Sequence, residues 1–268
     1  MKEEGYEIDI VNITSDGTVD IEHLKSLIRD DTILVSVCYV DSEVGTVQPI
    51  KEIAEIVKQY PNCFLHVDCT QAMGKIKIDL SDVDLVSFAP HKFYGLNGFG
   101  ALIKRKDIVL EPLINGGAST SIYRSGTPVV GQICALETAL ELAYKELETR
   151  KNFVTNLNTM IRNHMLKYND VKINTSSIEN PYILNISVNE IKAVDFKEKL
   201  EEYGVCISIK SACTITITPS RIVMAMTHDR KRALSSWRIS LSHLIKEEDI
   251  TRFLEIFDEC YKFLKEEK

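Results

Sequence analysis

The first part of the chain alternates short apolar runs with segments whose apolar residues have helical spacing. The apolar runs cover residues 33–40, 63–67, 84–89 and 100–104. Between the first two lies residues 50–59, where apolar side chains recur every three or four positions, as on one face of a helix. This rhythm predicts a largely parallel sheet with helices on its faces. Ligands bind to such sheets beyond the carboxyl ends of the strands.

The sequence after residue 130 predicts a second architecture. We expect one long helix over residues 131–168, which would bridge two domains. The later pattern predicts strands at 182–188, 204–208 and 236–241, and helices at 193–203, 219–226 and 246–266. Such a mixture is typical of a small α+β domain. We therefore expect residues 1–140 to belong to a large ligand-binding domain, and residues 141–268 to form the bridging helix and a small C-terminal domain.

Composition and charge exclude several classes of protein. The 268 residues carry a formal net charge of −7, which argues against a general role on nucleic acids or anionic membranes. No apolar run approaches the roughly 18 residues of a membrane helix, and the first ten residues lack the apolar core of a secretory signal. The seven cysteines are odd in number and include no CxxC pair, which disfavours a disulfide framework or a zinc site. We expect no metal and a reducing cytoplasm.

The first chemically distinctive cluster is SFAPHKFYG at residues 87–95, where Lys92 follows a predicted buried strand and stands beside His91. A lysine in a desolvated site has a lowered pKa and forms an imine with a carbonyl group. An aldehyde cofactor such as pyridoxal 5'-phosphate requires an amine of this kind. A surface lysine in a β-turn explains the same pattern equally well.

The second cluster is HVDCTQAMGK at residues 66–75, where Asp68 follows another predicted strand. A carboxylate in this place is often only a helix N-cap. It would also hold a pyridine nitrogen protonated, because opposite charges about 4 Å apart attract by about 4 kcal/mol at an effective dielectric constant near 20. That attraction equals roughly three pKa units before desolvation is subtracted. Gln71, expected one helical turn further on, would then contact the ring hydroxyl.

Four separated motifs together resemble the cysteine desulfurases of the class V aminotransferase superfamily. HVDCTQAMGK and SFAPHKFYG are followed by RSGTP at 124–128 and SACT at 211–214, in the order typical of that family. The segment EVGTVQPI at 43–50 agrees as well. The resemblance implies a pyridoxal-phosphate-dependent transferase of fold type I, with an incomplete large domain and a smaller C-terminal domain. It also implies conversion of L-cysteine to L-alanine.

The resemblance assigns roles to five residues around the cofactor. It implies that Lys92 binds the cofactor covalently and later moves the Cα proton. Asp68 pairs with the pyridinium nitrogen, Gln71 contacts the phenolic oxygen, and His91 lies near the phosphate. Ser42 stands where the family usually has an asparagine that contacts the cofactor, so this contact is expected to be shortened or lost.

The resemblance also assigns residues to the substrate, the partner subunit and the transferred sulfur. Thr127 matches a threonine that reaches the phosphate of the neighbouring protomer, which implies a homodimer. Arg238 matches the arginine that clamps the substrate carboxylate, a task that suits bidentate geometry. Cys213 matches the cysteine that receives sulfur as a persulfide and passes it to an acceptor or iron–sulfur scaffold protein. Lys210 is expected to favour the thiolate of Cys213, whereas Cys206 is expected to be a buried core thiol.

The amino-terminal residues lack two features of the family. Residues 1–30 contain neither the family's Gly-Thr loop, which cradles the phosphate at a helix N-terminus, nor its ring-stacking histidine. Ala89 stands where a serine is usual. We therefore expect weak cofactor binding by this polypeptide alone. Two alternatives follow: a catalytically impaired chain that acts as an interaction module, or another class V enzyme such as a selenocysteine lyase or an aminotransferase.

Overall fold

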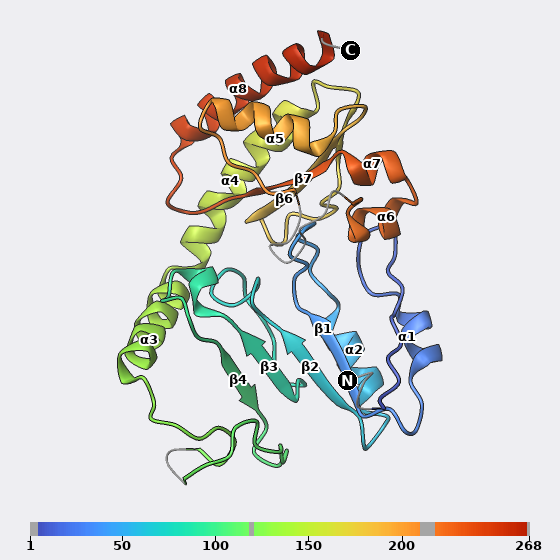
Figure 1. Cartoon of the computed structure of the whole chain (residues 1–268), viewed down its shortest axis with the longest axis vertical. Coiled ribbons are helices and arrows are strands. Elements are labelled where there is room, and N and C mark those ends of the chain that lie inside the picture. The colour runs from blue at the N-terminus through green and yellow to red at the C-terminus, as the bar shows by residue number, and fades with distance from the viewer. Residues whose placement is uncertain (1–4, 118–120, 210–217, 267–268) are drawn as a thin grey trace.

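The chain folds into two lobes, each built around its own sheet (Figure 1). The computed structural model describes residues 5–117, 121–209 and 218–266. Buried apolar residues form one core in the first lobe and another in the second, with a small third cluster around Val44 and Val223 between them. No helix in these described ranges is both long enough and apolar enough to cross a membrane.

The larger sheet has four strands in the order β1-β2-β3-β4. These are β1 (Leu34–Cys38), β2 (Phe64–Asp68), β3 (Leu85–Phe88) and β4 (Ala101–Lys104). The first three are parallel, and β4 pairs antiparallel with β3. The prediction of a mainly parallel sheet is confirmed. Its register places Cys38, Asp68 and Ser87 side by side near the carboxyl ends of the three parallel strands.

Helices cover one face of this sheet and leave the other open. The covering helices are α1 (Ile21–Leu27), α2 (Ile50–Val57) and α3 (Val130–Lys145). The apolar positions of α2 are buried against Leu65 and Val67 of β2, as their helical spacing predicts. On the opposite face, Leu34, Phe64 and Leu102 remain 37%, 37% and 57% exposed. The polar site residues of β2 lie on this open face, because side chains alternate along a strand.

The second lobe is an antiparallel sheet covered by long helices, as predicted for an α+β unit. Its strands β5 (Val171–Ile173), β6 (Ile183–Val188) and β7 (Ser236–Ser240) are joined in that order. The helices are α4 (Leu147–Met165), α5 (Ala193–Glu202), α6 (Arg221–Thr227), α7 (Arg230–Leu234) and α8 (Glu247–Glu266). Trp237 and Phe257 are fully buried and both stack on Phe196, with ring centroids 5.3 and 5.2 Å from it.

Three sequence-based predictions are wrong in this half of the chain. The helix expected over 131–168 is divided at Glu146, whose φ of −110° and ψ of 11° separate α3 from α4. The strand expected at 204–208 does not form, because Gly204 reverses the chain with a φ of +76° and only Ser208 then pairs with Arg238. Cys206, expected in the core, is exposed for the same reason.

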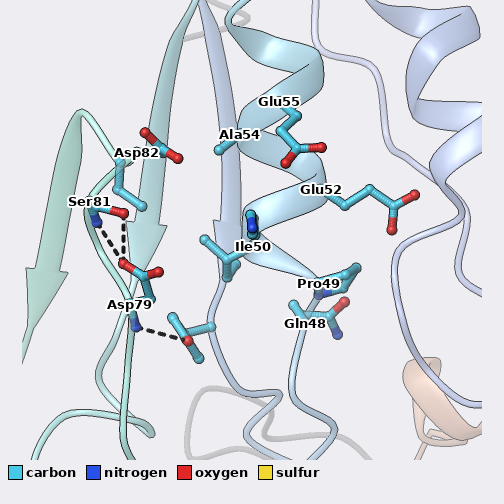
Figure 2. Close-up of a pocket in the computed structure, with 12 residues that line it drawn as sticks. Gln48, Pro49, Ile50, Glu52, Ala54, Glu55, Asp79, Ser81 and Asp82 are labelled. Atoms are coloured by element: carbon cyan, nitrogen blue, oxygen red, sulfur yellow. Dashed lines mark hydrogen bonds between the residues drawn. The ribbon is translucent and has the colours of Figure 1, made fainter.

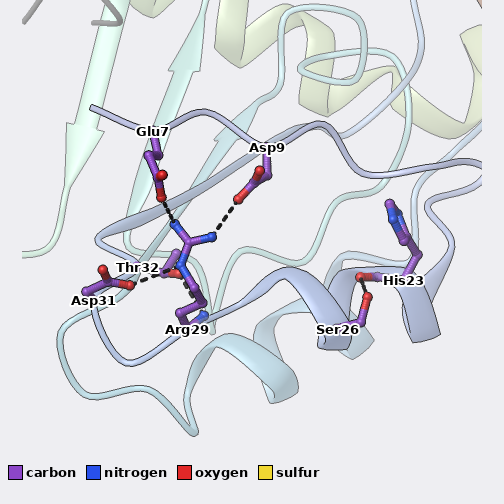
Figure 3. Close-up of polar contacts among 7 residues, drawn as sticks. All are labelled: Glu7, Asp9, His23, Ser26, Arg29, Asp31 and Thr32. Atoms are coloured by element: carbon purple, nitrogen blue, oxygen red, sulfur yellow. Dashed lines mark hydrogen bonds and ion pairs between the residues drawn. The ribbon is translucent and has the colours of Figure 1, made fainter. Parts of the chain in front are cut away.

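A single arginine holds the amino-terminal segment beside α1. The Arg29 guanidinium donates to Glu7 at 2.7 Å, Asp9 at 2.9 Å and Asp31 at 3.2 Å (Figure 3). All four side chains are substantially exposed, so each pair contributes little to stability. Their shared guanidinium nevertheless fixes where the extended residues 6–11 run.

Candidate functional site

Asp68 ends β2 and begins the turn that carries Gln71. Its Oδ1 accepts a hydrogen bond from the backbone nitrogen of Thr70 at 2.8 Å. This bond favours a tight turn in place of the expected helical turn, so Gln71 lies within a run of turns over residues 70–75. The carboxylate also acts on the thiol of Cys38, whose pKa is raised to about 12 by burial together with the charges of Asp41 and Asp68.

Lys92 lies on a short 3-10 helix, η2 (Pro90–Phe93), directly after β3. Phe93 is buried and anchors this helix, while the side chains of His91 and Lys92 are exposed. Tyr94 ends η2 in the left-handed conformation with a φ of 73°. The sequence therefore presents Lys92 at the strand end, as predicted, but on a solvent-facing side.

The turn after β2 packs directly on η2. Gly74 has a φ of +69°, and a Cβ added there would lie 3.1 Å from Cβ of Phe93 and 3.0 Å from Cβ of Ala143. Only glycine fits both the conformation and the close approach. This contact fixes the position of the turn relative to η2, and thus the position of Gln71 relative to Lys92.

Lys75 is a partly buried amine at the end of this turn. Its Nζ donates to Oε1 of Gln71 at 2.9 Å and lies 5.9 Å from the ring centroid of Tyr182. Burial, together with the positive charges of Lys92 and Arg238, lowers the pKa of Lys75 to about 8. Cationic side chains from η2 and β7 therefore lie close enough to Lys75 to act on it electrostatically.

Arg238 lies on β7 of the second lobe and is held by Ser42 of the first. Its Nη1 donates to the backbone oxygen of Ser42 at 2.6 Å, and its Nε donates to Oγ of Ser240 at 3.1 Å. Burial lowers the pKa of Arg238, and the nearby carboxylates of Glu43 and Asp41 oppose this effect. The structure thus brings two predicted site residues together, although Ser42 contributes its backbone and not its hydroxyl.

The turn around Ser42 is itself locked against the second lobe. Asp41 Oδ1 accepts from the backbone nitrogens of Glu43 and Val44 at 2.8 and 2.7 Å. Nδ2 of Asn185 donates to the Glu43 backbone oxygen at 3.2 Å, and Oγ of Ser220 donates to its carboxylate at 2.7 Å. The last two contacts join the lobes beside Ser42, whose backbone oxygen accepts from Arg238.

Two predicted site residues lie apart from this cluster. Thr127 is exposed in the segment that precedes α3, and His91 is exposed on η2. Within the described ranges, neither side chain is hydrogen-bonded to another candidate residue. Cys213 and Lys210 fall outside the described residues.

Sequence reasoning missed Lys75 and a contact that joins η2 to the second lobe. The Tyr94 hydroxyl and the Ser242 hydroxyl are 2.8 Å apart, and the Tyr94 ring meets the His243 ring edge-on at a centroid distance of 4.7 Å. The signal for Lys75 was its place directly after Ala72, Met73 and Gly74 at the end of the turn. Nothing local to Tyr94 indicates partners nearly 150 residues away.

The lowered pKa of Lys75 predicts a pH dependence of stability. Between its folded pKa of about 8 and its ordinary value of 10.5, the unfolded chain holds a proton that the folded chain has released. Stability from this group therefore rises with pH across that window. We expect the free energy of unfolding of the wild type, relative to Lys75→Met, to rise by about 2 kcal/mol between pH 7.5 and pH 9.5.

Urea denaturation of both proteins at the two pH values measures this difference. Lys77→Met is the matched control, since Lys77 lies two residues further on and is exposed. Its stability relative to the wild type should stay constant with pH. An equal pH response of the Lys75→Met variant and the wild type would contradict the burial of a charged amine at position 75.

The hollow drawn in Figure 2 lies away from this cluster. It encloses about 570 Å³ between the start of α2 and residues 79–83, and none of the predicted site residues lines it. Asp79 is held there by the backbone nitrogen and the hydroxyl of Ser81, at 3.0 and 2.7 Å. The chemistry-bearing residues of the chain thus gather at the strand ends and not in this hollow.

An exposed lysine on a loop after a strand, a carboxylate at the next strand end and an arginine from a second lobe define a class of site. Such a site lies where α/β proteins bind their ligands, beyond the carboxyl ends of parallel strands.

The sequence profile described as aminotransferase class-V matches residues 1–253. A mitochondrial cysteine desulfurase of Arabidopsis thaliana is 36% identical over 96% of this chain and 57% of its own length. A cysteine desulfurase of Clostridium botulinum is 33% identical over 99% of this chain and 68% of its own. A solved NifS-like protein superposes with a TM-score of 0.89 and 32% identity, covering 98% of this chain and 70% of that one.

The chain belongs to the class V aminotransferase family. Its fold is that of the NifS-like structures, which confirms the predicted fold class. It spans between 57% and 68% of the length of these two curated relatives.

Proposed function

We propose that this chain carries the catalytic strand-end site of a cysteine desulfurase, which converts L-cysteine to L-alanine with pyridoxal 5'-phosphate. The observation that carries the proposal is the hydrogen bond that holds Arg238 of the second lobe to the Ser42 backbone of the first, beside Lys75, on whose amine both Lys92 and Arg238 act electrostatically. An amine and a guanidinium suit a ligand with separate carbonyl and carboxylate groups. The names of the relatives support cysteine as the amino acid.

The side chains at the strand ends fit the cofactor by their chemistry. Lys92 offers an exposed amine for an aldehyde, and Asp68 offers a carboxylate for a protonated ring nitrogen. Gln71 offers an amide for the phenolic oxygen. The bound cofactor would supply an electron sink for negative charge that develops at the substrate Cα.

The chain's own residues then have distinct tasks. Lys92 moves the proton at the substrate Cα, and Asp68 keeps the ring nitrogen charged. Arg238 holds the substrate carboxylate, with its guanidinium already oriented by the Ser42 carbonyl and the Ser240 hydroxyl. His91 is proposed to meet the cofactor phosphate, since it stands exposed next to Lys92.

In this proposal the substrate sulfur is transferred to Cys213. Its thiolate attacks the substrate Sγ, the substrate Cβ–Sγ bond breaks, and alanine departs while Cys213 keeps the sulfur as a persulfide. The acceptor is proposed to be a protein of iron–sulfur or thio-cofactor assembly in the cytoplasm. A homodimer is part of the proposal, because Thr127 is exposed and free to reach a neighbouring protomer's cofactor.

The proposal also assigns a function to each lobe. Residues 1–140 are proposed to hold the cofactor, and residues 141–268 to form the bridging helices and the substrate-side domain. Two separate buried cores support this division, one ending at Ala143 and the other beginning at Val154.

Alanine formation tests the proposed function. The purified chain is incubated with pyridoxal 5'-phosphate, L-cysteine and dithiothreitol, and alanine and sulfide are quantified. We expect the two products in equal amounts. Amino transfer to a 2-oxo acid without sulfide would replace this function with that of an aminotransferase, and turnover restricted to selenocysteine would replace it with that of a lyase.

A further inference from the structure

We propose that Lys75 is a positioning residue that orients the Gln71 side chain, so that its NH2 group and not its oxygen faces the ligand. This inference rests on the proposed function for the identity of the ligand, but its structural part does not.

The hydrogen bond between the two side chains decides which end of the amide is available. Nζ of Lys75 donates to Oε1 of Gln71 at 2.9 Å. An ammonium group has donors only, so it selects the oxygen end of an amide that could otherwise flip. The nitrogen end is then left to contact a ligand, and it can only donate.

Lys75 is itself held in place from several sides. Its backbone nitrogen donates to the oxygen of Ala72 at 3.0 Å, and its amine lies 5.9 Å from the centre of the Tyr182 ring. The preceding Gly74 packs against Phe93 and Ala143. A fixed amine gives the Gln71 amide one preferred orientation, which a mobile surface lysine would not.

The groups around the Lys75 amine are mainly cationic. Lys92 from η2 and Arg238 from β7 both act on it electrostatically, while Gln71 on its own turn is neutral. Burial and these charges together bring its deprotonation near pH 8, so loss of charge within an accessible pH range should loosen the Gln71 amide. A pH dependence of the Gln71 side-chain amide therefore distinguishes this interaction from that of a lysine that only stabilises the fold.

A donating amide has a chemical consequence for the cofactor. An N–H donor stabilises an ionised phenolic oxygen over its protonated form. Lys75→Met should therefore make the phenolic oxygen of the bound cofactor harder to ionise. Lys75→Arg keeps a charged donor and should restore much of the effect.

The first experiment needs no cofactor and follows the Gln71 side-chain amide by NMR in isotope-labelled protein. The signal is identified by its loss in Gln71→Ala. We expect it to titrate with a midpoint near pH 8 in the wild type. The titration should vanish in Lys75→Met and persist in the control Lys77→Met. A Gln71 signal that is indifferent to pH, or that titrates equally in Lys75→Met, overturns the proposal.

The second experiment uses the protein loaded with pyridoxal 5'-phosphate and follows its visible spectrum against pH. We expect Lys75→Met to raise the midpoint by about 0.5 to 1 pH unit, as the loss of one hydrogen-bond donor would. Gln71→Ala should give a similar shift, and the double variant no more than either alone, because the two residues act as one unit. Additive shifts would overturn the proposed coupling. A wild type that binds no cofactor defeats the proposed function, while the NMR result still decides the role of Lys75.

Discussion

Lys92→Ala is expected to form alanine from L-cysteine at least about 10³-fold more slowly than the wild type, because general acid–base catalysis by one group contributes about 10²- to 10⁴-fold. The change removes both the amine that holds the cofactor and the group that moves the Cα proton. The side chain of Lys92 is exposed, so its truncation should leave the fold intact. Alanine release under saturating cysteine measures the loss, and circular dichroism checks the fold.

Lys106→Ala is the matched control for this prediction. Lys106 is also an exposed lysine of the first lobe, and it follows β4 as Lys92 follows β3. Its variant should keep the wild-type rate. If Lys92→Ala retained more than a tenth of the activity, Lys92 would not be the catalytic amine. Lys75 would then be the next candidate.

The second large effect is expected at Cys213. Cys213→Ala should form persulfide and alanine at least about 10²-fold more slowly, because the reaction then lacks its nucleophile. Cofactor binding should change less than twofold, since this thiol is not among the groups proposed to hold the ring. Mass spectrometry of the protein after a single turnover measures one added sulfur atom.

Cys206→Ala tests whether any exposed thiol can accept the substrate sulfur. Cys206 is an exposed thiol that lies seven residues before Cys213 in the sequence. Its variant should still gain one sulfur atom on Cys213. Sulfur found on Cys206, or unchanged turnover of Cys213→Ala, would contradict the assigned route.

The sequence predicted the elements whose evidence is local. Apolar runs and helical spacing identified the strands β1 to β4 and the helix α2 to within two residues at each end, because burial on one face leaves a periodic pattern. The break at Glu146 left no such pattern, since both flanking segments have helical spacing. Residues 204–208 were misassigned because their apolar side chains match a strand, whereas Gly204 turns the chain away.

The site was predictable in the same uneven way. Asp68 ends one parallel strand and Lys92 follows the next, and their positions could be inferred from the order of parallel strands alone. The hydrogen bond from Arg238 to Ser42 joins residues 196 positions apart, and no periodicity carries such a contact. Lys75 was overlooked because its function depends on what packs around Gly74, and that packing involves Phe93 and Ala143 from other elements.

The central claim is that Lys92 is the amine that binds the cofactor, and peptide mapping tests it most directly. The chain is incubated with pyridoxal 5'-phosphate, reduced with borohydride and digested, and the modified lysine is located by mass spectrometry. The account predicts a reduced cofactor adduct on Lys92. An adduct on Lys75 or scattered over surface lysines, or no adduct at saturating cofactor, would contradict it.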